Sequence, residues 1–520
     1  MRCFESKRKM ENSLSLRGNR LAAIPRNSEP NLEKLDQDSY HPSRNPGGVI
    51  NLGTSENKLM YDVLSQKFQE NVSHDVLKEH TQYCDFGGLP SFKKAVADFL
   101  NYYMKPAETI DPNNLLVQNG CATVVEALGT VLADPGDGIL IPAPYYGGFN
   151  ADLCQRAQVV PFPVYLSSKP GPGENGPFQL SVWRLEDALD KAKKQGVTIR
   201  GILLTNPNNP VGNIYSDELL QDCLDFAHKH KLHVIFDEIY MLSVFKKEYS
   251  FKSILSFKNI PDRERLHVIW GFSKDFGVSG FRCGVLHTWN KKVQSSLRWI
   301  AYFQSVPTPT QILLTNLIED KDWINNVFLP ANHQRLRECY QLVCDSFKEA
   351  KIPYIDIQAG LFVWADFREI MPSLTFEEEL ALFEKFIEHK VYITPAQAFF
   401  CDEPGWFRLV FATDPEELKL GMTRVLMCFE KLREEVANKK RLLEGKTPTE
   451  STGLEQNGAS CRVLAGVASL DEAGDTLEDL ARALRKQIQN SDWLQKNTAE
   501  KWTQENPDLA KVFMDLKDSE

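Results

Sequence analysis

The sequence lacks any run of 18 consecutive apolar residues, which argues against a transmembrane helix. Its eleven cysteines are scattered along the chain, and no two of them have Cys-x-x-Cys spacing. This pattern argues against a zinc ribbon or a disulfide framework, and it favours free thiols in a reducing compartment. We therefore expect a cytoplasmic protein that needs no metal and does not cross a membrane.

An excess of positive charge is also missing. The chain has 60 Lys and Arg against 70 Asp and Glu, a formal net charge of −10. Such a balance argues against nucleic acid or an anionic membrane as the main partner. The N-terminus lacks the apolar stretch of a secretory signal, although basic residues outnumber acidic ones in residues 1–26. A mitochondrial presequence is therefore the alternative to a basic, disordered tail.

The chain divides into regions of different composition. Residues 1–45 are polar and lack periodicity, so we expect a disordered tail. Residues 46–75 are expected to join the small domain. From 76 to 328, helical stretches alternate with nearly continuous apolar runs, as expected for strands buried on both faces. This alternation predicts an α/β large domain whose mostly parallel sheet is flanked by helices. The runs lie at 114–117, 138–141, 201–205 and 233–236.

The C-terminal part is predicted to contain a second domain and an extension. Residues 329–434 are predicted to form a smaller α/β domain, with a long helix, a strand and a terminal helix. Residues 435–463 are rich in Lys, Glu, Thr, Ser and Gly and are expected to be a linker. Residues 464–520 are predicted to be a helical extension, because apolar residues form a helical stripe at 477–488. This extension could pack on the body of the protein, bind a protein partner, or form a helix only transiently.

The segment 271–282 carries the most informative chemistry. It follows an apolar stretch and contains Lys274 on a short polar turn, with Arg282 eight residues further on. A lysine amine can form a Schiff base with an aldehyde, and the planar fork of an arginine can bind a phosphate. Pyridoxal phosphate carries both groups. Taken alone, the segment has another interpretation, which is an ordinary solvated turn.

A carboxylate and two further polar residues are candidates for contacts with the ring of such a cofactor. Asp237 follows the apolar run 232–236, and ligands collect at the carboxyl ends of parallel strands. Asp237 there can pair with a pyridine nitrogen, while Tyr240 and Asn209 can bond a ring oxygen. The alternatives are a helix N-cap for the aspartate, a core position for the tyrosine and a generic Asn-Pro turn around Asn209.

Three more segments offer contacts to the phosphate, the ring face and a substrate. The segment 119–128 follows a strand and begins a helix, and free N–H groups at a helix N-terminus bind phosphate. Tyr145 or Tyr146 could stack on a planar ring. Arg408 lies in an apolar strand, where a buried guanidinium needs an anionic partner such as a substrate carboxylate. The alternatives are an ordinary turn, packing tyrosines and a structural salt bridge.

Taken in order, these segments resemble the fold-type I pyridoxal phosphate enzymes of the 1-aminocyclopropane-1-carboxylate (ACC) synthase and class I aminotransferase family, and specifically the animal ACC synthase-like proteins. The resemblance runs from about residue 45 to 433 and includes the segments 50–57, 87–92 and 359–362. It implies that Lys274 binds the cofactor aldehyde and moves the Cα proton, and that Asp237 pairs with the pyridinium. The other implied cofactor contacts are Ala122, Thr123, Tyr146, Asn209, Tyr240, Ser273 and Arg282, and the implied substrate contacts are Glu56 and Arg408.

The chain departs from this family at two positions. Phe86 stands where the family usually has a tyrosine whose hydroxyl reaches the active site of the neighbouring subunit. Gly271 stands where a serine usually contacts the phosphate, three residues before Lys274. Each lost bond to a charged group is worth roughly 1.5–3 kcal/mol, or about tenfold or more in affinity. We therefore expect weaker cofactor binding if nothing compensates, and no cross-subunit hydrogen bond at Phe86.

The resemblance implies a homodimer that acts on a small amino acid through an external aldimine and a Cα carbanion. Because Phe86 lacks the hydroxyl, we expect transamination or deamination rather than ACC synthesis from S-adenosylmethionine. The second hypothesis is a weakly active protein with the same fold, whose C-terminal helices bind a protein partner.

Overall fold

The computed structural model describes residues 14–23, 37–70 and 81–443, together with the helices and strands within these ranges. A seven-stranded sheet forms the centre of the larger domain, with strand order β2-β8-β7-β6-β5-β3-β4. Only β8 runs antiparallel to its neighbours, so the sheet is mostly parallel, as predicted. The strands are β2 (Leu115–Gln118), β3 (Gly138–Ala143), β4 (Val160–Tyr165), β5 (Ile199–Thr205), β6 (His233–Asp237), β7 (Leu266–Gly271) and β8 (Gly284–Thr288).

Both faces of this sheet are buried, which explains why its strands are continuously apolar. In β6, Ile235 packs into one hydrophobic cluster, while Val234 and Phe236 pack into another on the opposite face. This alternation follows the two-residue period of a strand. The flanking helices are α4 (Pro90–Met104), α5 (Cys121–Leu132), α6 (Gly148–Cys154), α7 (Val182–Lys194), α8 (Asp217–His230), α10 (Lys291–Gln304) and α11 (Thr308–Glu319). The predicted fold class, an α/β large domain with helices on both faces, is confirmed.

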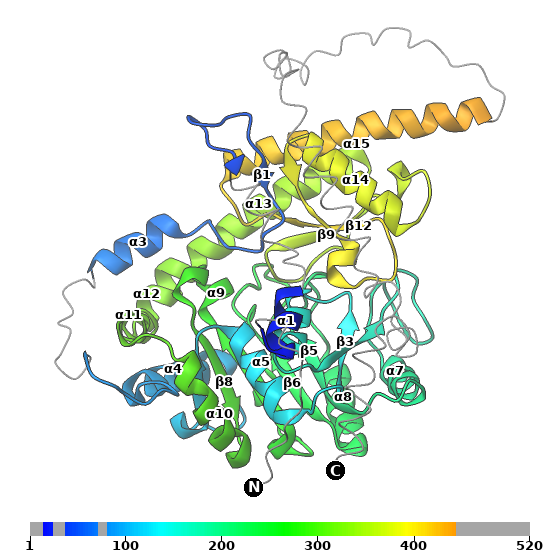
Figure 1. Cartoon of the computed structure of the whole chain (residues 1–520). Coiled ribbons are helices and arrows are strands. Elements are labelled where there is room, and N and C mark those ends of the chain that lie inside the picture. Colours follow the sequence, from blue (N-terminus) through cyan, green and yellow to red (C-terminus); the bar gives the residue numbers. More distant parts are fainter. Residues whose placement is uncertain (1–13, 24–36, 71–80, 444–520) are drawn as a thin grey trace.

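The smaller domain lies above the large one in Figure 1 and contains an antiparallel sheet of order β11-β12-β9. Helix α13 runs for 22 residues, and it is continuous with α12 through a π-helical turn at Ile324–Phe328. The elements are α12 (Lys321–Trp323), α13 (Leu329–Ala350), β9 (Phe362–Asp366), α14 (Phe376–Glu388), β10 (Val391–Tyr392), β11 (Thr394–Pro395), β12 (Trp406–Val410) and α15 (Pro415–Leu443).

The N-terminal segment joins the small domain through backbone pairing. Strand β1 (Ile50–Asn51) pairs in parallel with β10, and the chain then continues to α3 (Tyr61–Glu70). Part of the region expected to be disordered has regular structure, since α1 spans Leu16–Ala23 and Ser39 forms a bridge with Val49. Helix α15 also continues past residue 435, where a linker was expected. The rest of the predicted linker and the C-terminal extension lie outside the described residues.

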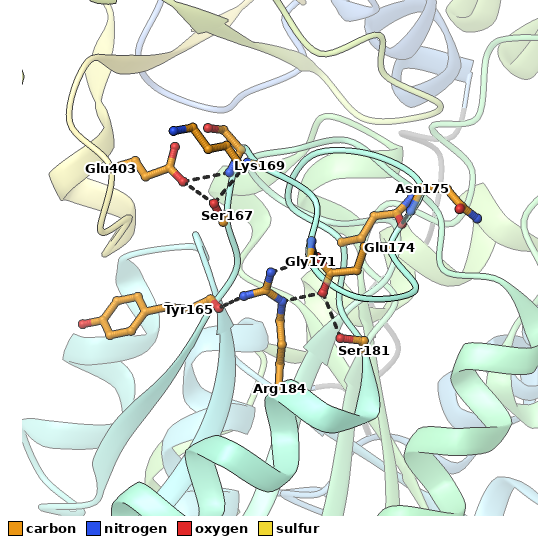
Figure 2. A network of polar contacts seen from close by, with 11 residues as sticks. Tyr165, Ser167, Lys169, Gly171, Glu174, Asn175, Ser181, Arg184 and Glu403 are labelled. Atoms are coloured by element: carbon orange, nitrogen blue, oxygen red, sulfur yellow. Dashed lines mark hydrogen bonds and ion pairs between the residues drawn. The ribbon is translucent and has the colours of Figure 1, made fainter.

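A partly buried ion pair organises the long loop that follows β4, as Figure 2 shows. Arg184 binds both carboxylate oxygens of Glu174, at 2.5 and 2.8 Å, and donates to the carbonyl of Tyr165. The same loop is held to the small domain, because Glu403 accepts hydrogen bonds from the hydroxyl of Ser167 and the N–H of Ser168. The loop therefore fixes one side of the boundary between the two domains.

In the described ranges, no helix is both long and apolar enough to cross a membrane.

Three histidines occupy neighbouring strands at the edge of the sheet where β6 and β7 begin. His267 is fully buried between His233 and Thr288, with one ring nitrogen 2.9 Å from each partner. His287 is also buried, and its Nδ1 has no hydrogen-bond partner in the described part of the chain. Burial lowers the pKa of His233 and of His287 to about 4, and it lowers the pKa of His267 as well.

These histidines predict loss of stability in mild acid. Above pH 6.5 the rings are neutral in both the folded and the unfolded state, so they make no difference. Below that pH the unfolded chain takes up protons that the folded chain refuses, and stability falls until about pH 4. For His287 the loss between pH 7 and 5 is about 2 kcal/mol. His287→Leu should reduce the fall in the urea unfolding midpoint between these pH values, whereas His228→Leu, at an exposed position of α8, should not. Equal falls in parent and His287→Leu would contradict this assignment.

Candidate functional site

Polar residues follow the carboxyl ends of several strands that run in the same direction, and they meet at one edge of the large sheet. Asp237 ends β6, and Asn206 follows β5 with its N–H donating to the carbonyl of Asp237 at 3.0 Å. Gly120 follows β2, and Lys274 follows β7 within the single-turn helix α9 (Phe272–Asp275). The sheet topology therefore brings together segments that lie far apart in the sequence.

Lys274 is held at this edge by the N-terminal segment. Its Nζ donates to the carbonyl of Ser55 at 2.5 Å. Burial lowers the pKa of Lys274 to about 8, and the positive charge of Arg408 acts in the same direction, while Glu56 and Asp237 oppose it. A lysine amine with a pKa near 8 loses its proton far more readily than an exposed one, which is the condition for nucleophilic or base chemistry.

The residue after Lys274 fixes the position of its turn. Asp275 is fully buried and accepts three hydrogen bonds, from the indole Nε1 of Trp270 at 3.0 Å, the hydroxyl of Ser243 at 2.9 Å and the N–H of Leu242 at 3.1 Å. Burial raises the pKa of Asp275 to about 7, although these donors oppose the rise. Asp275 therefore ties the Lys274 turn to the loop that follows Asp237.

Asp237 is a buried carboxyl group that receives little hydrogen bonding from the residues around it. It is 6% exposed and accepts a long hydrogen bond from the N–H of Ile239 at 3.3 Å. Burial raises the pKa of Asp237 to about 7, and the charge of Lys274 lowers it. The charges of Asp237 and Lys274 act on each other, so the two groups lie within electrostatic range at the same edge of the sheet.

The start of helix α5 forms a cradle next to Arg282. No side chain caps this helix end, and its N-cap residue is Gly120 with φ of 111°. A Cβ at Gly120 would lie 2.5 Å from a guanidinium nitrogen of Arg282, so only glycine allows this approach. Ala122 and Thr123 lie in the first turn, where the Thr123 hydroxyl donates to the Gly120 carbonyl at 2.8 Å. Uncapped N–H groups beside an arginine are suited to an anion.

Arg408 is a buried guanidinium without an acidic partner in the described part of the chain. Strand β12 places it 5% exposed, where it donates to the Oδ1 of Asn209 at 3.0 Å and to the carbonyl of Gly53 at 2.6 Å. Its Nε has no partner. The rings of Phe399 and Phe362 lie 4.7 and 5.3 Å from the guanidinium carbon. The structural salt bridge that was the alternative is thus absent among the described residues.

The two adjacent tyrosines have different environments. Tyr145 is 2% exposed, stacks on Phe400 at 5.1 Å and donates to Asn150, so it belongs to the core. Tyr146 is 43% exposed and lies within electrostatic range of Asp237, Arg282 and Arg408. Of the two, Tyr146 is therefore the one available to a ligand.

The remaining predicted residues lie around the same space. The hydroxyl of Tyr240 is 3.3 Å from that of Ser55, and Tyr240 is buried. Glu56 accepts a hydrogen bond from Ser279 at 2.5 Å, and its charge acts on Lys274. Ser273 is 8% exposed in α9 beside Lys274.

The glycine at the position of the family's serine has a local explanation. A Cβ at Gly271 would lie 2.6 Å from the Sγ of Cys121 and 3.0 Å from the carbonyl of Cys283. Cys121, at the start of α5, therefore occupies the space into which a side chain at Gly271 would project. The glycine at position 271 and the thiol of Cys121 therefore depend on each other for space.

Sequence reasoning assigned no role to Ser55, Gly53 or Asp275. Ser55 and Gly53 contact predicted residues, and Asp275 anchors the turn that carries Lys274. Ser55 and Gly53 act mainly through backbone carbonyls, which any residue type supplies, so their identity gave no signal. Asp275 follows Lys274 directly in the sequence. A carboxylate in an apolar segment needs hydrogen-bond donors around it, and this requirement could have identified Asp275 as an anchor of the turn.

Comparison with known proteins agrees with this geometry. Residues 47–425 match the family Aminotransferase class I and II. The chain is 43% identical over 411 residues to the human probable inactive ACC synthase-like protein 2, covering 79% of this chain and 72% of that protein. It is 42% identical over 417 residues to ACC synthase-like protein 1 of Bos taurus, covering 80% and 83%. The Thermus thermophilus aspartate aminotransferase structure with maleate matches with a TM-score of 0.64 and 19% identity, covering 80% of this chain and all of that chain.

The family match covers most of the chain, and the folds agree over the whole length of the solved enzyme. The chain therefore belongs to the class I and II aminotransferase family, with pyridoxal phosphate as its cofactor.

Proposed function

We propose that this protein is an enzyme that binds the α-carboxylate of a small amino acid at Arg408 and catalyses transamination or deamination with pyridoxal phosphate. The observation that carries the proposal is the guanidinium of Arg408, which is buried, lacks an acidic partner in the described ranges and has an unpartnered Nε. A buried charge without a counterion is costly, so a site that keeps one is built for an anionic ligand.

The residues at the sheet edge fit the cofactor. Gly120, Arg282 and the first turn of α5 form a cradle for a phosphate, because the helix end is uncapped and a Cβ at Gly120 would close the space. Ala122, Thr123 and Ser273 would add contacts there. Asp237 is buried and has no cationic hydrogen-bond partner in the described part of the chain, which suits a ring nitrogen. Asn209, Tyr240 and Tyr146 would hold the ring itself.

Pyridoxal phosphate, when bound, supplies an aldehyde for a lysine amine and a ring that withdraws electrons from the Cα of an amino acid. Lys274 is the amine at this place, and its lowered pKa allows it to accept and return a proton near neutral pH. A cation placed beside Asp237 would keep its carboxyl ionised, because a nearby positive charge lowers a pKa that burial has raised. Glu56 would face the substrate, close to Lys274.

Phe86 favours transamination or deamination over ACC synthesis. Its ring has no hydroxyl and packs against Tyr302 with the ring centres 5.0 Å apart. ACC synthesis from S-adenosylmethionine, the alternative activity, would have to proceed without the hydrogen bond that the family tyrosine supplies. The second candidate is a weakly active protein that binds a partner. It is favoured by the similarity to the human probable inactive ACC synthase-like protein 2.

The role of Lys274 predicts a spectroscopic signal. Purified protein should show a visible absorption band with pyridoxal phosphate, which borohydride removes, and Lys274→Ala should lack the band because no other amine takes its place. Lys252→Ala, on the surface of the large domain, should keep it. Adding small amino acids should shift the band if the enzyme turns over. A band that responds to no amino acid would favour the partner-binding candidate, and ACC formed from S-adenosylmethionine would contradict our choice of reaction.

The role of Arg408 predicts selective loss of amino acid binding. Arg408→Gln should lower kcat/KM for the best amino acid substrate by roughly tenfold to hundredfold, because charge-assisted bonds to its carboxylate are lost. The matching amine without a carboxylate should react equally with both proteins. Arg424→Gln, which also removes a small-domain arginine bonded to backbone carbonyls, serves as the control. Equal losses of kcat/KM for the amino acid and for the amine would show that Arg408 does not bind the carboxylate.

We further propose that the protein is a homodimer. Aromatic side chains gather on α10 and on the segment before α4, with Tyr83 95%, Trp299 82% and Phe303 79% exposed. Phe86 and Tyr302 touch within the same surface. Such an exposed apolar surface marks an interface. The family resemblance, in which the active site is built between subunits, identifies a second copy of this chain as the partner.

The homodimer predicts a mass of two chains in light scattering after gel filtration. Charge placed in this aromatic surface should split the dimer, because Trp299→Asp with Phe303→Asp would bury two unpaired carboxylates. Leu374→Asp introduces the same charge at an exposed leucine in the small domain and should leave the mass unchanged. A double variant that remains dimeric would place the interface elsewhere.

A further inference from the structure

A cavity lies at the boundary between the two domains, and its lining includes none of the candidate-site residues. Its volume is about 430 Å³, within the range of ligand sites. The large domain contributes the segment Phe245 to Glu248, and the small domain contributes the middle of α13 together with Tyr354 and Asp356. None of these residues belongs to the proposed cofactor or substrate site.

The cavity is positively charged although the whole chain is acidic. Four of its lining side chains are basic and two, Glu248 and Asp356, are acidic, whereas the chain has a net charge of −10. Basic residues gathered in a concave, partly apolar surface raise the local concentration of anions. The contrast with the rest of the molecule indicates a ligand of negative charge.

The acidic and basic groups of the cavity are not all paired with each other. Asp356 binds Lys246 at 2.6 Å and Tyr340 at 2.5 Å, so its carboxylate is already satisfied. In the described part of the chain, the amines of Lys247 and Lys348 have no hydrogen-bond or ion-pair partner. Arg337 uses one nitrogen for the carbonyl of Phe245, at 2.8 Å, and retains its other donors.

The unpaired cations come from both domains. Lys247 lies on the large domain, whereas Arg337 and Lys348 lie eleven residues apart on α13, which is three turns of one helical face. The same two parts of the protein are joined nearby, since His333 lies 2.7 Å from the carbonyl of Leu242. The ring of Tyr340 packs on Phe245 and gives the cavity an apolar wall.

We propose that this cavity binds a small polyanion, a molecule with two or more phosphate or carboxylate groups, between Lys247 of the large domain and Arg337 and Lys348 of the small domain. One anionic group cannot satisfy cations on both sides as well as two can, which is why a polyanion fits better than a single phosphate. The bound molecule bridges the domain boundary and stabilises the folded protein by mass action.

Calorimetric titration of the full chain, saturated with pyridoxal phosphate and then dialysed, tests the proposal with pyrophosphate and with citrate as probes. At least one probe should bind with a dissociation constant between about 10 μM and 1 mM, and should raise the thermal unfolding midpoint. The two arms distinguish phosphate from carboxylate as the recognised group. If neither probe gives saturable heat at 10 mM, about tenfold above that range, the proposal is wrong.

Two variants locate the binding. Lys247→Gln with Lys348→Gln should weaken binding of the probe at least roughly tenfold, whereas Lys193→Gln with Lys194→Gln, an equal charge change at exposed positions of α7, should not. Gln341→Trp changes no charge but fills the cavity, and it should weaken binding as well. Binding that survives both cavity variants would overturn the assignment. The calorimetric readout needs no turnover, so failure of the proposed enzyme activity and failure of this site are distinguishable.

Discussion

The contact on which the geometry of the candidate site depends is that of Arg408 with two neutral acceptors. Its guanidinium reaches Asn209 in the large domain and the carbonyl of Gly53 in the N-terminal segment, while its own backbone belongs to the small domain. Three parts of the chain are therefore joined at one buried cation. No acid among the described residues neutralises it, so the arrangement costs free energy that a bound carboxylate would recover.

Much of the fold was readable from the sequence, because hydrophobic periodicity and sheet topology follow simple rules. Continuous apolar runs predicted strands buried on both faces, and β6 shows that arrangement through Val234, Ile235 and Phe236. The carboxyl ends of parallel strands had to share one edge, so Asp237 and Lys274 were expected to meet. They end or follow the paired strands β6 and β7, and their charges act on each other, while the chemical roles assigned to them remain predictions.

What the sequence could not give depends on backbone groups and on pairs of side chains. The backbone carbonyl of Ser55 accepts a hydrogen bond from Lys274. Every residue has such a carbonyl, so the residue type at this position could not predict the contact. Gly271 looked like a lost phosphate contact, yet the structure shows Cys121 filling the space beside it. The packing of Cys121 against Gly271 joins two positions far apart in the sequence, and neither position alone predicts it. Helix α1 lies in a polar region without long periodicity, and α15 continues beyond the point where the composition changes.

The loop after Asp237 connects the chemistry of the site with the domain boundary. It begins at Asp237 and Tyr240, binds Asp275 through Leu242 and Ser243, and ends at Phe245, whose carbonyl accepts from Arg337 on α13. Asp275 in turn fixes the turn of Lys274. Because these bonds are buried or partly buried, the loop has little freedom to move by itself. A displacement of α13 at the boundary must therefore either break these bonds or be transmitted to the turn that carries Lys274, so the position of the small domain and the position of the Lys274 amine are set together.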